Sequence, residues 1–571
     1  MDLSFNIGGA AGQGINTIGD LVAQVFVKNG LYTFTIKDYM SRVRGGYNFT
    51  QIRVSDEHVH APVHSVDVII ALTKDAIVNQ RERLIEGGVI IFDESLDFEE
   101  CERCHLPLPL EETAEEVGGD VRMMNAAALG ALLSVLKMPV SLAENALADI
   151  FGDKGDSVVE GNVKVARTMF EEVKGELAQR CDHDFSSVEN APSKDRLLVT
   201  GNQAIALGAM AANLKWISAY PMSPSTSLFE FIIQNAQRLQ IGGLQTEDEI
   251  AGLNMALGAS HTGARSMVTT SGGGFSLMVE AVGLAGMAEI PIVIYNAQRP
   301  GPSTGLPTRT EQGDLLFMLH SSQGEFPRIM IGPKDPLEAY YLTKNAFRLA
   351  DKFQVPVMLL GDQHLAEFSM NIPRIEIEEI SMERGKLAES SDDSYKRFKI
   401  TEDGVSPRAF PGDEGMVVAA SGNTHNEFGH ISEDPDNRNA MVEKRLAKIP
   451  RILDELEEPK VYGDEKADYT LLTWGSTWGA AYEAMQRLSQ DGVSINHLHF
   501  AYLYPLKTKR LNRIWNEAKK IISVEQNATS QFAKLIRMES GLSVDEEINK
   551  YDGRPMTPEW IIKELREVGV R

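Results

Sequence analysis

The sequence predicts a multidomain α/β protein, and three observations support this. The chain has 571 residues, which is too long for a single hydrophobic core. Apolar strand patterns alternate with helix patterns along most of its length. The apolar share of 43% and the charged share of 24% are ordinary for a globular protein in water.

The first predicted domain covers residues 1–181. It begins with a strand pattern at 3–7, which runs into the glycine-rich segment 8–14 and then into a helix pattern with apolar residues at helical spacing. Strand–loop–helix alternation continues, so we expect a parallel α/β domain. Further strands are predicted at 66–72 and 88–92. The polar segment 182–195 has no apolar period and is predicted to be a linker.

Two further α/β units are predicted after this linker. Residues 196–375 form the second domain, which opens with a strand at 196–200. The charged segment 376–460 is predicted to be a connector with one helix at 439–456, and residues 461–571 form the third unit. The other strands predicted in these two units are 266–270, 292–295, 355–360, 469–473, 495–500 and 520–525.

The charge and the hydropathy pattern exclude two classes of partner. A net charge of −25 opposes non-specific binding to nucleic acid, which requires a basic surface. It equally opposes a polybasic membrane anchor. The most apolar helical stretch, 123–140, is too short and too rich in small residues to span a bilayer. It is predicted to be a buried helix, and no secretion signal is expected at the N-terminus.

The three cysteines indicate a cytoplasmic protein without a metal site of its own. An odd, sparse cysteine count fits a reducing compartment. Residues 101–105 match the C-x-x-C-H pattern of haem attachment, but that chemistry requires export. Three thiols cannot supply the four ligands of a [4Fe–4S] cluster, so any cluster is expected on another chain.

Two loops of the first domain are candidates for anion binding. Residues 9–14 join a strand to a helix, where free N–H groups and the helix dipole favour an anion. Their glycine spacing differs from that of dinucleotide-binding folds. Residues 41–46 place two guanidinium groups beside flexible glycines, which suits phosphate contacts, although a turn with solvated arginines explains them as well. The candidate residues are Gly12, Gln13, Gly14, Ser41, Arg42, Arg44, Gly45 and Gly46.

The second domain contains a rigid loop rich in hydroxyl groups. Residues 220–227 combine two prolines with four aliphatic hydroxyls. The prolines stiffen the backbone, and Ser225 or Thr226 is expected to cap a helix that begins near Leu228. A stiff loop with hydroxyls at the end of a strand suits the binding of a small polar substrate.

Two charged residues in the same domain are candidates for catalysis and substrate binding. Glu249 precedes an uncharged helix of small residues that we expect to be buried, where a carboxylate is easily desolvated. The helix dipole alone also accounts for an acid there. Arg299 follows an apolar strand in a loop that contains three prolines, where it can bind a carboxylate, although a solvated loop arginine explains it as well.

Together these motifs resemble the α subunit of 2-oxoacid:ferredoxin oxidoreductases with the γ subunit fused at its N-terminus. The resemblance covers essentially the whole chain. The family motif Tyr-Pro-Ile-Thr-Pro-Ser-Ser is present at 220–226, with Met222, Ser223 and Thr226 in place of Ile, Thr and the last Ser. Residues 422–427 and 524–527 are similar to the 2-oxoglutarate-type branch.

The resemblance implies roles for the domains and for the candidate residues. The first domain is implied to be a γ-type domain associated with coenzyme A, the second to resemble a pyrimidine-binding domain of thiamine-diphosphate enzymes, and the third to resemble a transketolase C-terminal domain. Glu249 is implied to be the catalytic residue that hydrogen-bonds the aminopyrimidine of thiamine diphosphate. The implied substrate-binding residues are Ser223, Arg299 and Thr308. A second carboxylate on the substrate would need a further cation, for which Arg309 is the candidate.

The resemblance further implies a β subunit that carries the diphosphate site, Mg²⁺ and a [4Fe–4S] cluster and passes electrons to ferredoxin, in a dimer of αβ units. The reaction is coenzyme A-dependent oxidative decarboxylation of a 2-oxoacid, with 2-oxoglutarate favoured, or its reverse. The alternatives are a branched-chain or broad-specificity 2-oxoacid enzyme and a non-catalytic coenzyme A-binding subunit. A self-sufficient thiamine-dependent transferase would require a Gly-Asp-Gly motif with a downstream Asn, which the sequence lacks.

Overall fold

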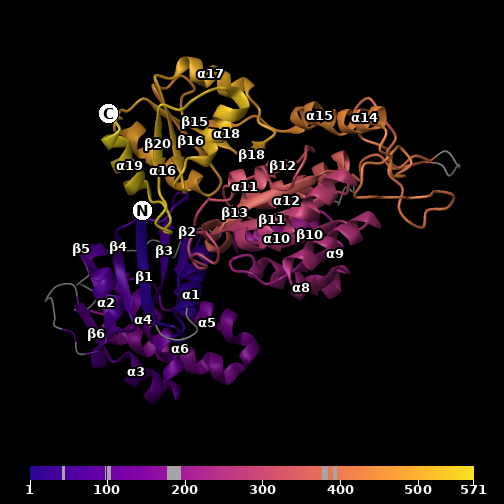
Figure 1. The fold of residues 1–571 in the computed structure, drawn as a ribbon. Coiled ribbons are helices and arrows are strands. Elements are labelled where there is room, and N and C mark those ends of the chain that lie inside the picture. Colours follow the sequence, from indigo (N-terminus) through magenta and orange to yellow (C-terminus); the bar gives the residue numbers. More distant parts are fainter. Residues whose placement is uncertain (42–45, 97, 99–104, 176–194, 376–382, 390–394) are drawn as a thin grey trace. The chain divides into compact units, whose positions relative to one another are not determined.

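The computed structural model describes residues 1–41, 46–96, 98, 105–175, 195–375, 383–389 and 395–571 (Figure 1). The chain divides into two compact units, each described by itself. Unit 1 comprises Met1–Val199, Phe368–Arg374 and Thr557–Glu559, and unit 2 comprises Thr200–Glu367, Ile375–Met556 and Trp560–Arg571. None of the helices within the described ranges combines the length and the apolar character needed to cross a membrane.

Unit 1 is built on an eight-stranded sheet in the order β6-β5-β4-β1-β3-β2-β14-β7. The strands predicted at 3–7, 66–72 and 88–92 are confirmed as β1, β4 and β5. The expectation of a parallel sheet is only partly met, because β3 runs antiparallel to both β1 and β2. The strand bounds are β1 Asp2–Ala10, β2 Tyr32–Asp38, β3 Tyr47–Ser55, β4 Val66–Ala71, β5 Leu84–Asp93, β6 His105–Leu108, β7 Arg196–Thr200 and β14 Ser369–Pro373.

The strand β7 lies in a different sheet from the one that the sequence pattern suggested. We expected residues 196–200 to open the second domain, but β7 is the edge strand of the first sheet, beside β14. Apolar alternation identifies a strand but carries no information about its pairing partner. Of the predicted linker 182–195, only Asp195 falls within the described residues.

Helices cover both faces of this sheet. A large apolar core lies between the sheet and α1, α4 and α6, and a smaller one lies on the other face around α2. Nearly every residue of α4 is buried, so the predicted buried helix is confirmed over Met124–Val135, although it ends five residues before the predicted bound at 140. The helices of unit 1 are α1 Ile15–Lys28, α2 Lys74–Gln80, α3 Leu110–Thr113, α4 Met124–Val135, α5 Ser141–Phe151 and α6 Asp156–Val173.

Unit 2 contains a seven-stranded sheet in the order β18-β12-β13-β11-β10-β8-β9. All of its strands are parallel except β18, which pairs antiparallel with β12. The strands are β8 Trp216–Ala219, β9 Gly242–Gln245, β10 Ser266–Thr270, β11 Ile292–Gln298, β12 Ile329–Ile331, β13 Pro356–Asp362 and β18 Tyr502–Tyr504. Its helices are α7 Gly201–Ala211, α8 Thr226–Leu239, α9 Glu249–His261, α10 Gly272–Met287, α11 Leu315–Leu319, α12 Pro336–Phe353 and α13 Gln363–Glu367.

The C-terminal segment of unit 2 forms a five-stranded sheet in the order β15-β17-β16-β19-β20. Because its strand β18 joins the seven-stranded sheet, one apolar core continues from α10 and β11 to Trp474 and Phe532. The strands are β15 Lys460–Tyr462, β16 Tyr469–Trp474, β17 Ile495–Phe500, β19 Lys520–Glu525 and β20 Glu546–Asn549. The helices are α16 Thr477–Gln490, α17 Lys509–Glu517, α18 Gln531–Ser540 and α19 Pro558–Glu567.

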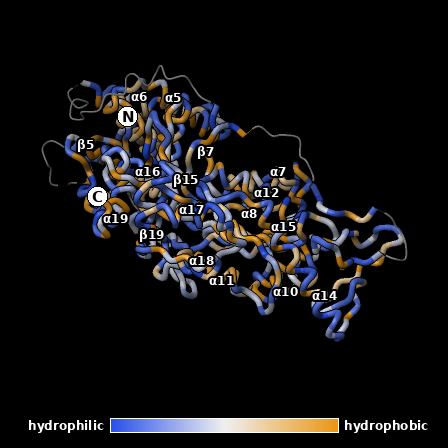
Figure 2. The backbone as a smooth tube through the Cα atoms, turned by 90° about the horizontal axis from the view of Figure 1, so that it is seen from above, coloured by the Kyte–Doolittle hydropathy of each residue, from blue (hydrophilic) through white to orange (hydrophobic). Residues whose placement is uncertain are grey.

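The connector contains two helices, α14 Pro435–Leu446 and α15 Lys448–Glu455, where one helix at 439–456 was predicted. In Figure 2, α14 is mostly blue, in keeping with its charged sequence. Buried ion pairs hold these helices to the rest of unit 2, since Lys444 and Lys448 each contact the carboxylate of Glu289 at 2.6 Å. Arg397 donates to the carbonyl oxygen of Glu289 at 2.9 Å. These ionic contacts act together with the buried apolar side chains of Met441 and Ile452 on the same helices.

Candidate active site

The hydroxyl-rich loop at 220–227 connects β8 to the start of α8 and is held in place by hydrogen bonds from the side chain of Asn202. The Asn202 amide donates to the carbonyl oxygen of Pro224 at 2.9 Å and to Ser227 Oγ at 2.8 Å. Tyr295 of β11 in turn donates to Asn202 Oδ1 at 2.9 Å. The loop is therefore fixed to the interior of the sheet, while the side chain of Ser223 remains exposed.

The expected side-chain cap of α8 is absent. The helix begins at Thr226, and Ser225 precedes it without accepting a hydrogen bond from its first turn. The Ser225 hydroxyl instead donates to the carbonyl oxygen of Met222 at 2.8 Å, across the turn. The hydroxyl thus stabilises the loop rather than the helix. Serine side chains commonly form such local hydrogen bonds to the backbone instead of capping a helix.

Glu249 is the first residue of α9, and its side chain is only 3% exposed. The preceding Asp248 caps the helix by accepting from the backbone N–H of Ala251 at 2.8 Å, which fixes where Glu249 emerges. The Oε1 atom of Glu249 is buried and has no hydrogen-bond partner among the described residues. Since a buried carboxylate oxygen without a partner is costly, its presence points to a ligand.

Arg299 follows β11 and is half-buried. Its Nη1 donates to the carbonyl oxygen of Ser223 at 2.7 Å, so the structure brings together two of the predicted substrate residues. Burial lowers the pKa of the Arg299 guanidinium, and the nearby Asp314 carboxylate acts in the opposite direction. A guanidinium has five N–H donors, so Arg299 can bind a carboxylate while keeping this contact.

We call residues 299–309 the arginine loop. It begins with Arg299 and ends with Thr308 and Arg309. The loop reverses on itself where the N–H of Leu306 donates to the carbonyl oxygen of Pro300 at 3.0 Å. Both Thr308 and Arg309 are half-buried, and Arg309 Nη1 donates to the carbonyl oxygen of Thr308 at 3.1 Å. Part of the Arg309 guanidinium is therefore occupied within the loop.

Three glycines at the start of α10 lie close to Glu249, to the arginine loop and to Asp314. A Cβ atom on Gly274 would lie 2.6 Å from Oε1 of Glu249, and one on Gly273 would lie 3.6 Å from the carbonyl oxygen of Ser303 in the arginine loop. One on Gly272 would lie 2.3 Å from Oδ2 of Asp314. Glu249, the arginine loop and Asp314 thus lie around the N-terminus of α10, where Gly272 and Gly274 pack too closely against them to carry a side chain.

Sequence reasoning missed two acids that follow the arginine loop, of which Asp314 lies near Arg299. Asp314 is largely buried and accepts from Asn296 Nδ2 at 2.9 Å, and burial raises its pKa. Burial, with a smaller contribution from Asp314, raises the pKa of Glu311 to about 7. Both follow the arginine loop directly, but no motif distinguishes them in the sequence from ordinary loop acids.

In unit 1, the two predicted anion-binding loops leave the same edge of the sheet. Ala10 at the end of β1 pairs with Tyr47, and Asp38 at the end of β2 pairs with Phe49. Segments 11–14 and 39–46 therefore start from neighbouring positions. Gly12 is exposed, and Gly14 directly precedes α1. Ser41 and Gly46 are also exposed, whereas Arg42, Arg44 and Gly45 lie outside the described residues.

The side chain of Gln13 has a structural role in this loop. Its Oε1 accepts from the backbone N–H of Ala10 at 2.8 Å, and its Nε2 donates to the carbonyl oxygen of Leu72 at 3.4 Å. These bonds fix the turn between β1 and α1. Of the loop's polar groups, the backbone N–H groups at the start of α1 are better placed than Gln13 to bind an anion.

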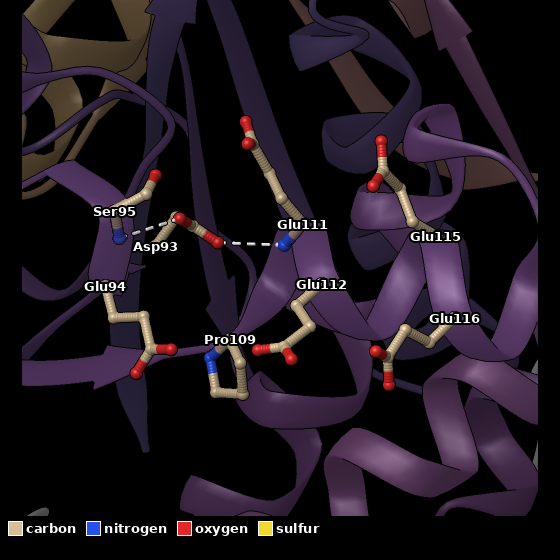
Figure 3. A pocket seen from close by; sticks show the side chains of 8 residues that line it. All are labelled: Asp93, Glu94, Ser95, Pro109, Glu111, Glu112, Glu115 and Glu116. Carbon is tan, nitrogen blue, oxygen red and sulfur yellow. Dashed lines mark hydrogen bonds between the residues drawn. The ribbon is translucent and has the colours of Figure 1, made fainter.

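A further cavity in unit 1, of about 640 Å³, was not anticipated from the sequence (Figure 3). Acidic side chains line it, and two of its contacts are internal, because Asp93 accepts from the N–H groups of Ser95 and Glu111. A phosphate-bearing ligand would be repelled here. The residues that line this cavity are Asp93, Glu94, Ser95, Pro109, Glu111, Glu112, Glu115 and Glu116.

In the described parts of the chain, no cluster of histidine, cysteine and acidic residues is arranged to hold a metal ion.

Comparison with known protein families matches both units. Residues 207–444 match the family described as pyruvate flavodoxin/ferredoxin oxidoreductase, thiamine diphosphate-binding. Residues 4–172 match the family described as pyruvate ferredoxin/flavodoxin oxidoreductase. The class defined by fold and site is therefore that of thiamine-diphosphate-dependent oxidoreductases.

Individual relatives identify the family within this class. A 2-oxoacid:ferredoxin oxidoreductase subunit alpha of a Sulfolobus species is 31% identical over 97% of this chain and 95% of its own length. The 2-oxoglutarate synthase subunit KorA of Methanothermobacter thermautotrophicus is 31% identical over 64% of this chain and 97% of its own. The chain belongs to the family of 2-oxoacid:ferredoxin oxidoreductase α subunits.

A solved structure agrees with this family over the entire chain. The 2-oxoglutarate:ferredoxin oxidoreductase from Magnetococcus marinus, with 2-oxoglutarate, coenzyme A and succinyl-CoA bound, is 32% identical, with a TM-score of 0.92. The match covers 99% of both chains. The predicted family and the multidomain α/β fold are thereby confirmed.

Proposed function

We propose that this α subunit acts on 2-oxoglutarate with thiamine diphosphate and coenzyme A, and that Glu249, Arg299 and Ser223 form its half of the active site. The observation that carries the proposal is the unpartnered, buried Oε1 of Glu249, which lies next to Gly274 at the N-terminus of α10. A ring N–H or protonated ring nitrogen of the cofactor would satisfy this oxygen. The site thus fits the pyrimidine end of thiamine diphosphate, which supplies the carbon nucleophile of the reaction when bound.

The residues of this chain would bind and orient the substrate. Arg299 holds a carboxylate with donors that its bond to Ser223 leaves available, and the exposed Ser223 hydroxyl donates to the 2-oxo group. Glu249 keeps a proton shared with the pyrimidine ring at Oε1. Half-burial of Arg299 strengthens its interaction with an anion, because fewer water molecules compete for it.

The preference for 2-oxoglutarate rests on two supports. The relative from Magnetococcus marinus binds 2-oxoglutarate and coenzyme A, and this chain matches it over nearly its full length. A second carboxylate needs a second cation, for which we propose Arg309, with Thr308 beside it. A broad 2-oxoacid specificity is the second candidate, because relatives matching 97% of the chain carry that more general name.

Coenzyme A is proposed to contact unit 1 at the end of the sheet where β1 and β2 end, next to residues 11–14. Its phosphates would accept hydrogen bonds from backbone N–H groups at the start of α1. The first turn of α1 contains no acidic residue that would oppose an anion. Ser41, Arg42, Arg44, Gly45 and Gly46 are proposed to complete this site.

We further propose a β subunit that holds Mg²⁺, the diphosphate and a [4Fe–4S] cluster and reduces ferredoxin, in a dimer of αβ units. Apolar side chains next to the site support a partner. Ile250 on α9 is 46% exposed and Leu277 on α10 is 49% exposed, although both helices begin at active-site residues. The sparse cysteines favour a cytoplasmic location.

The proposal is tested by assaying the α subunit assembled with its β partner. Coenzyme A-dependent viologen reduction is measured with 2-oxoglutarate, pyruvate and 2-oxoisovalerate. We expect 2-oxoglutarate to have the highest kcat/KM, and Arg299→Ala to lower it about 100-fold or more, mainly through KM. Arg309→Ala is expected to affect 2-oxoglutarate and to spare pyruvate. Equal loss with both substrates would contradict the role of Arg309.

A further inference from the structure

The arginine loop needs a rigid support that its own sequence does not provide. Residues 301–306 are exposed, and the loop contains backbone hydrogen bonds from the N–H of Leu306 to the carbonyl oxygen of Pro300 and from the N–H of Arg309 to that of Leu306. A carboxylate-binding guanidinium must nevertheless hold its position to within a fraction of an ångström to orient a reacting group. The two ends of the loop therefore decide how firmly Arg299, Thr308 and Arg309 are placed.

The first end is anchored in the seven-stranded sheet. Gln298, the last residue of β11, pairs with Asp362 of β13, and its Nε2 donates to the carbonyl oxygen of Gly361 at 3.0 Å. Its Oε1 accepts from the backbone N–H of Asp314 at 2.9 Å. The start of the arginine loop is thus tied to the residues that follow its end.

The second end is held by the C-terminal segment. The backbone N–H of Gln312 donates to the carbonyl oxygen of Gln526 at 2.7 Å, and Asn527 Nδ2 donates to the carbonyl oxygen of Gln312 at 3.3 Å. Gln531 donates to the carbonyl oxygen of Gly313 at 2.6 Å and accepts from the N–H of Leu316 at 3.0 Å. The side chains of Asn527 and Gln531 thus satisfy backbone groups at 312–316 that would pair with a neighbouring strand in a sheet.

The side chain of Gln312 connects all three parts. It is 0% exposed, and its Nε2 donates to Asp362 Oδ2 at 2.9 Å, at the end of β13. Its Oε1 accepts from the Thr477 hydroxyl at 3.1 Å, at the start of α16. Ser476 donates to the same oxygen of Asp362 at 2.6 Å. Every polar group of Gln312 is therefore used, in a site that excludes water.

We propose that Gln312 is a positioning residue through which the C-terminal segment fixes the arginine loop for substrate binding. This inference rests on the proposed function of Arg299 and deepens it. It also gives a role to two segments that the chemistry itself does not use, the turn at 474–477 and residues 525–527. The C-terminal segment then contributes to substrate affinity without touching the substrate.

The test compares Gln312→Ala with Gln354→Ala in the assembled αβ enzyme. Gln354 is a matched control, because it is equally buried in unit 2 and bonds through both ends of its amide, to Ser406 and Arg397. It precedes β13, whereas the site lies beyond the carboxyl ends of the parallel strands, so its loss leaves the arginine loop intact. We expect Gln312→Ala to raise KM for the 2-oxoacid about 10-fold or more, with a smaller change in kcat, and Gln354→Ala to leave KM within about 2-fold.

Hydrogen–deuterium exchange provides a readout that does not depend on substrate. Exchange at residues 300–309 is expected to increase in Gln312→Ala and to remain unchanged in Gln354→Ala. The double variant Gln312→Glu with Asp362→Asn reverses the polarity of the central hydrogen bond and keeps the total charge, so it is expected to recover most of the KM and the exchange protection. Gln312→Glu alone sets two carboxylates against each other and is expected to be worse than Gln312→Ala.

The outcomes separate this inference from the proposed function. If Arg299→Ala raises KM while Gln312→Ala leaves both KM and exchange unchanged, the positioning role is overturned and the substrate role of Arg299 stands. If exchange at 300–309 rises but neither Arg299→Ala nor Gln312→Ala alters KM, the proposed function fails, and a role of Gln312 in substrate affinity fails with it.

Discussion

Replacing Glu289 by Gln tests how the charged connector is held to unit 2. Glu289 is 1% exposed, and its two carboxylate oxygens each contact one buried lysine, Lys444 and Lys448, at 2.6 Å. Burial raises the pKa of Glu289, but Lys448, Lys444 and Arg397 outweigh it and hold the pKa below the usual range. Burial lowers the pKa of Lys448 to about 8 against the opposing effect of Glu289, so the charges are retained at neutral pH.

The magnitude follows from the charges that the substitution leaves behind. A glutamine keeps one acceptor but turns its amide N–H₂ towards the second ammonium group, so two buried cations share no anion. Breaking a buried ion pair from one side costs about 3–5 kcal/mol. In a unit of roughly 360 residues, each kcal/mol corresponds to about 1–2 °C in Tm, so we expect a decrease of about 3–10 °C.

The assay is differential scanning calorimetry of the full chain at pH 7, with an exposed ion pair as the control. Arg513 and Glu465 lie 2.5 Å apart but are 47% and 46% exposed. Arg513→Ala is therefore expected to change Tm by less than about 1 °C. Replacing Glu289, Lys444 and Lys448 together by Met should recover most of the loss, because no buried charge remains unpaired. A Tm of Glu289→Gln within 1 °C of the parent would refute this reasoning.

Two further predictions concern the active site directly. Gly274→Ala would place its Cβ 2.6 Å from Glu249 Oε1 and 2.2 Å from Thr270 Oγ1, so we expect activity to fall about 10-fold or more. Gly273→Ala is the control, because its Cβ would make only ordinary contacts, and it should keep activity within about 2-fold. Equal effects of the two substitutions would argue against crowding at Gly274 as the cause. Glu311 has a raised pKa of about 7, so it is neutral below this pH and ionised above it, where its charge adds to that of Asp314. Because this adds negative charge to the segment that follows the arginine loop, kcat/KM for the 2-oxoacid should fall between pH 6 and 8, less so in Glu311→Gln. Parallel profiles would exclude Glu311 as the titrating group.

The sequence predicted the regular elements of unit 2 more closely than their assembly. The strands at 266–270, 495–500 and 520–525 have the predicted bounds, because each is a short run containing apolar residues between polar or glycine-containing segments. The edge strand β7 has an equally clear pattern, yet it pairs with the first sheet. Pairing depends on contacts between residues far apart in the sequence, which a local pattern cannot contain.

The candidate site was predictable where a motif was present and not where geometry alone creates the chemistry. Glu249, Ser223 and Arg299 were found through the family resemblance, and the structure places Arg299 on Ser223. Asp314 and Gln312 lie in an unremarkable loop sequence and acquire their environments only when the sheet and the C-terminal segment enclose them. Local signals could not have separated these residues from other loop residues.

Glu249→Gln in the assembled αβ enzyme tests the central claim most directly. Glutamine preserves the size of the side chain but removes the carboxylate, and Glu247→Gln is a matched control because Glu247 is exposed two residues away. We predict that Glu249→Gln lowers coenzyme A-dependent viologen reduction with 2-oxoglutarate by about 100-fold or more, while Glu247→Gln stays within about 2-fold. Full activity of Glu249→Gln would contradict the assignment of this carboxylate to the cofactor.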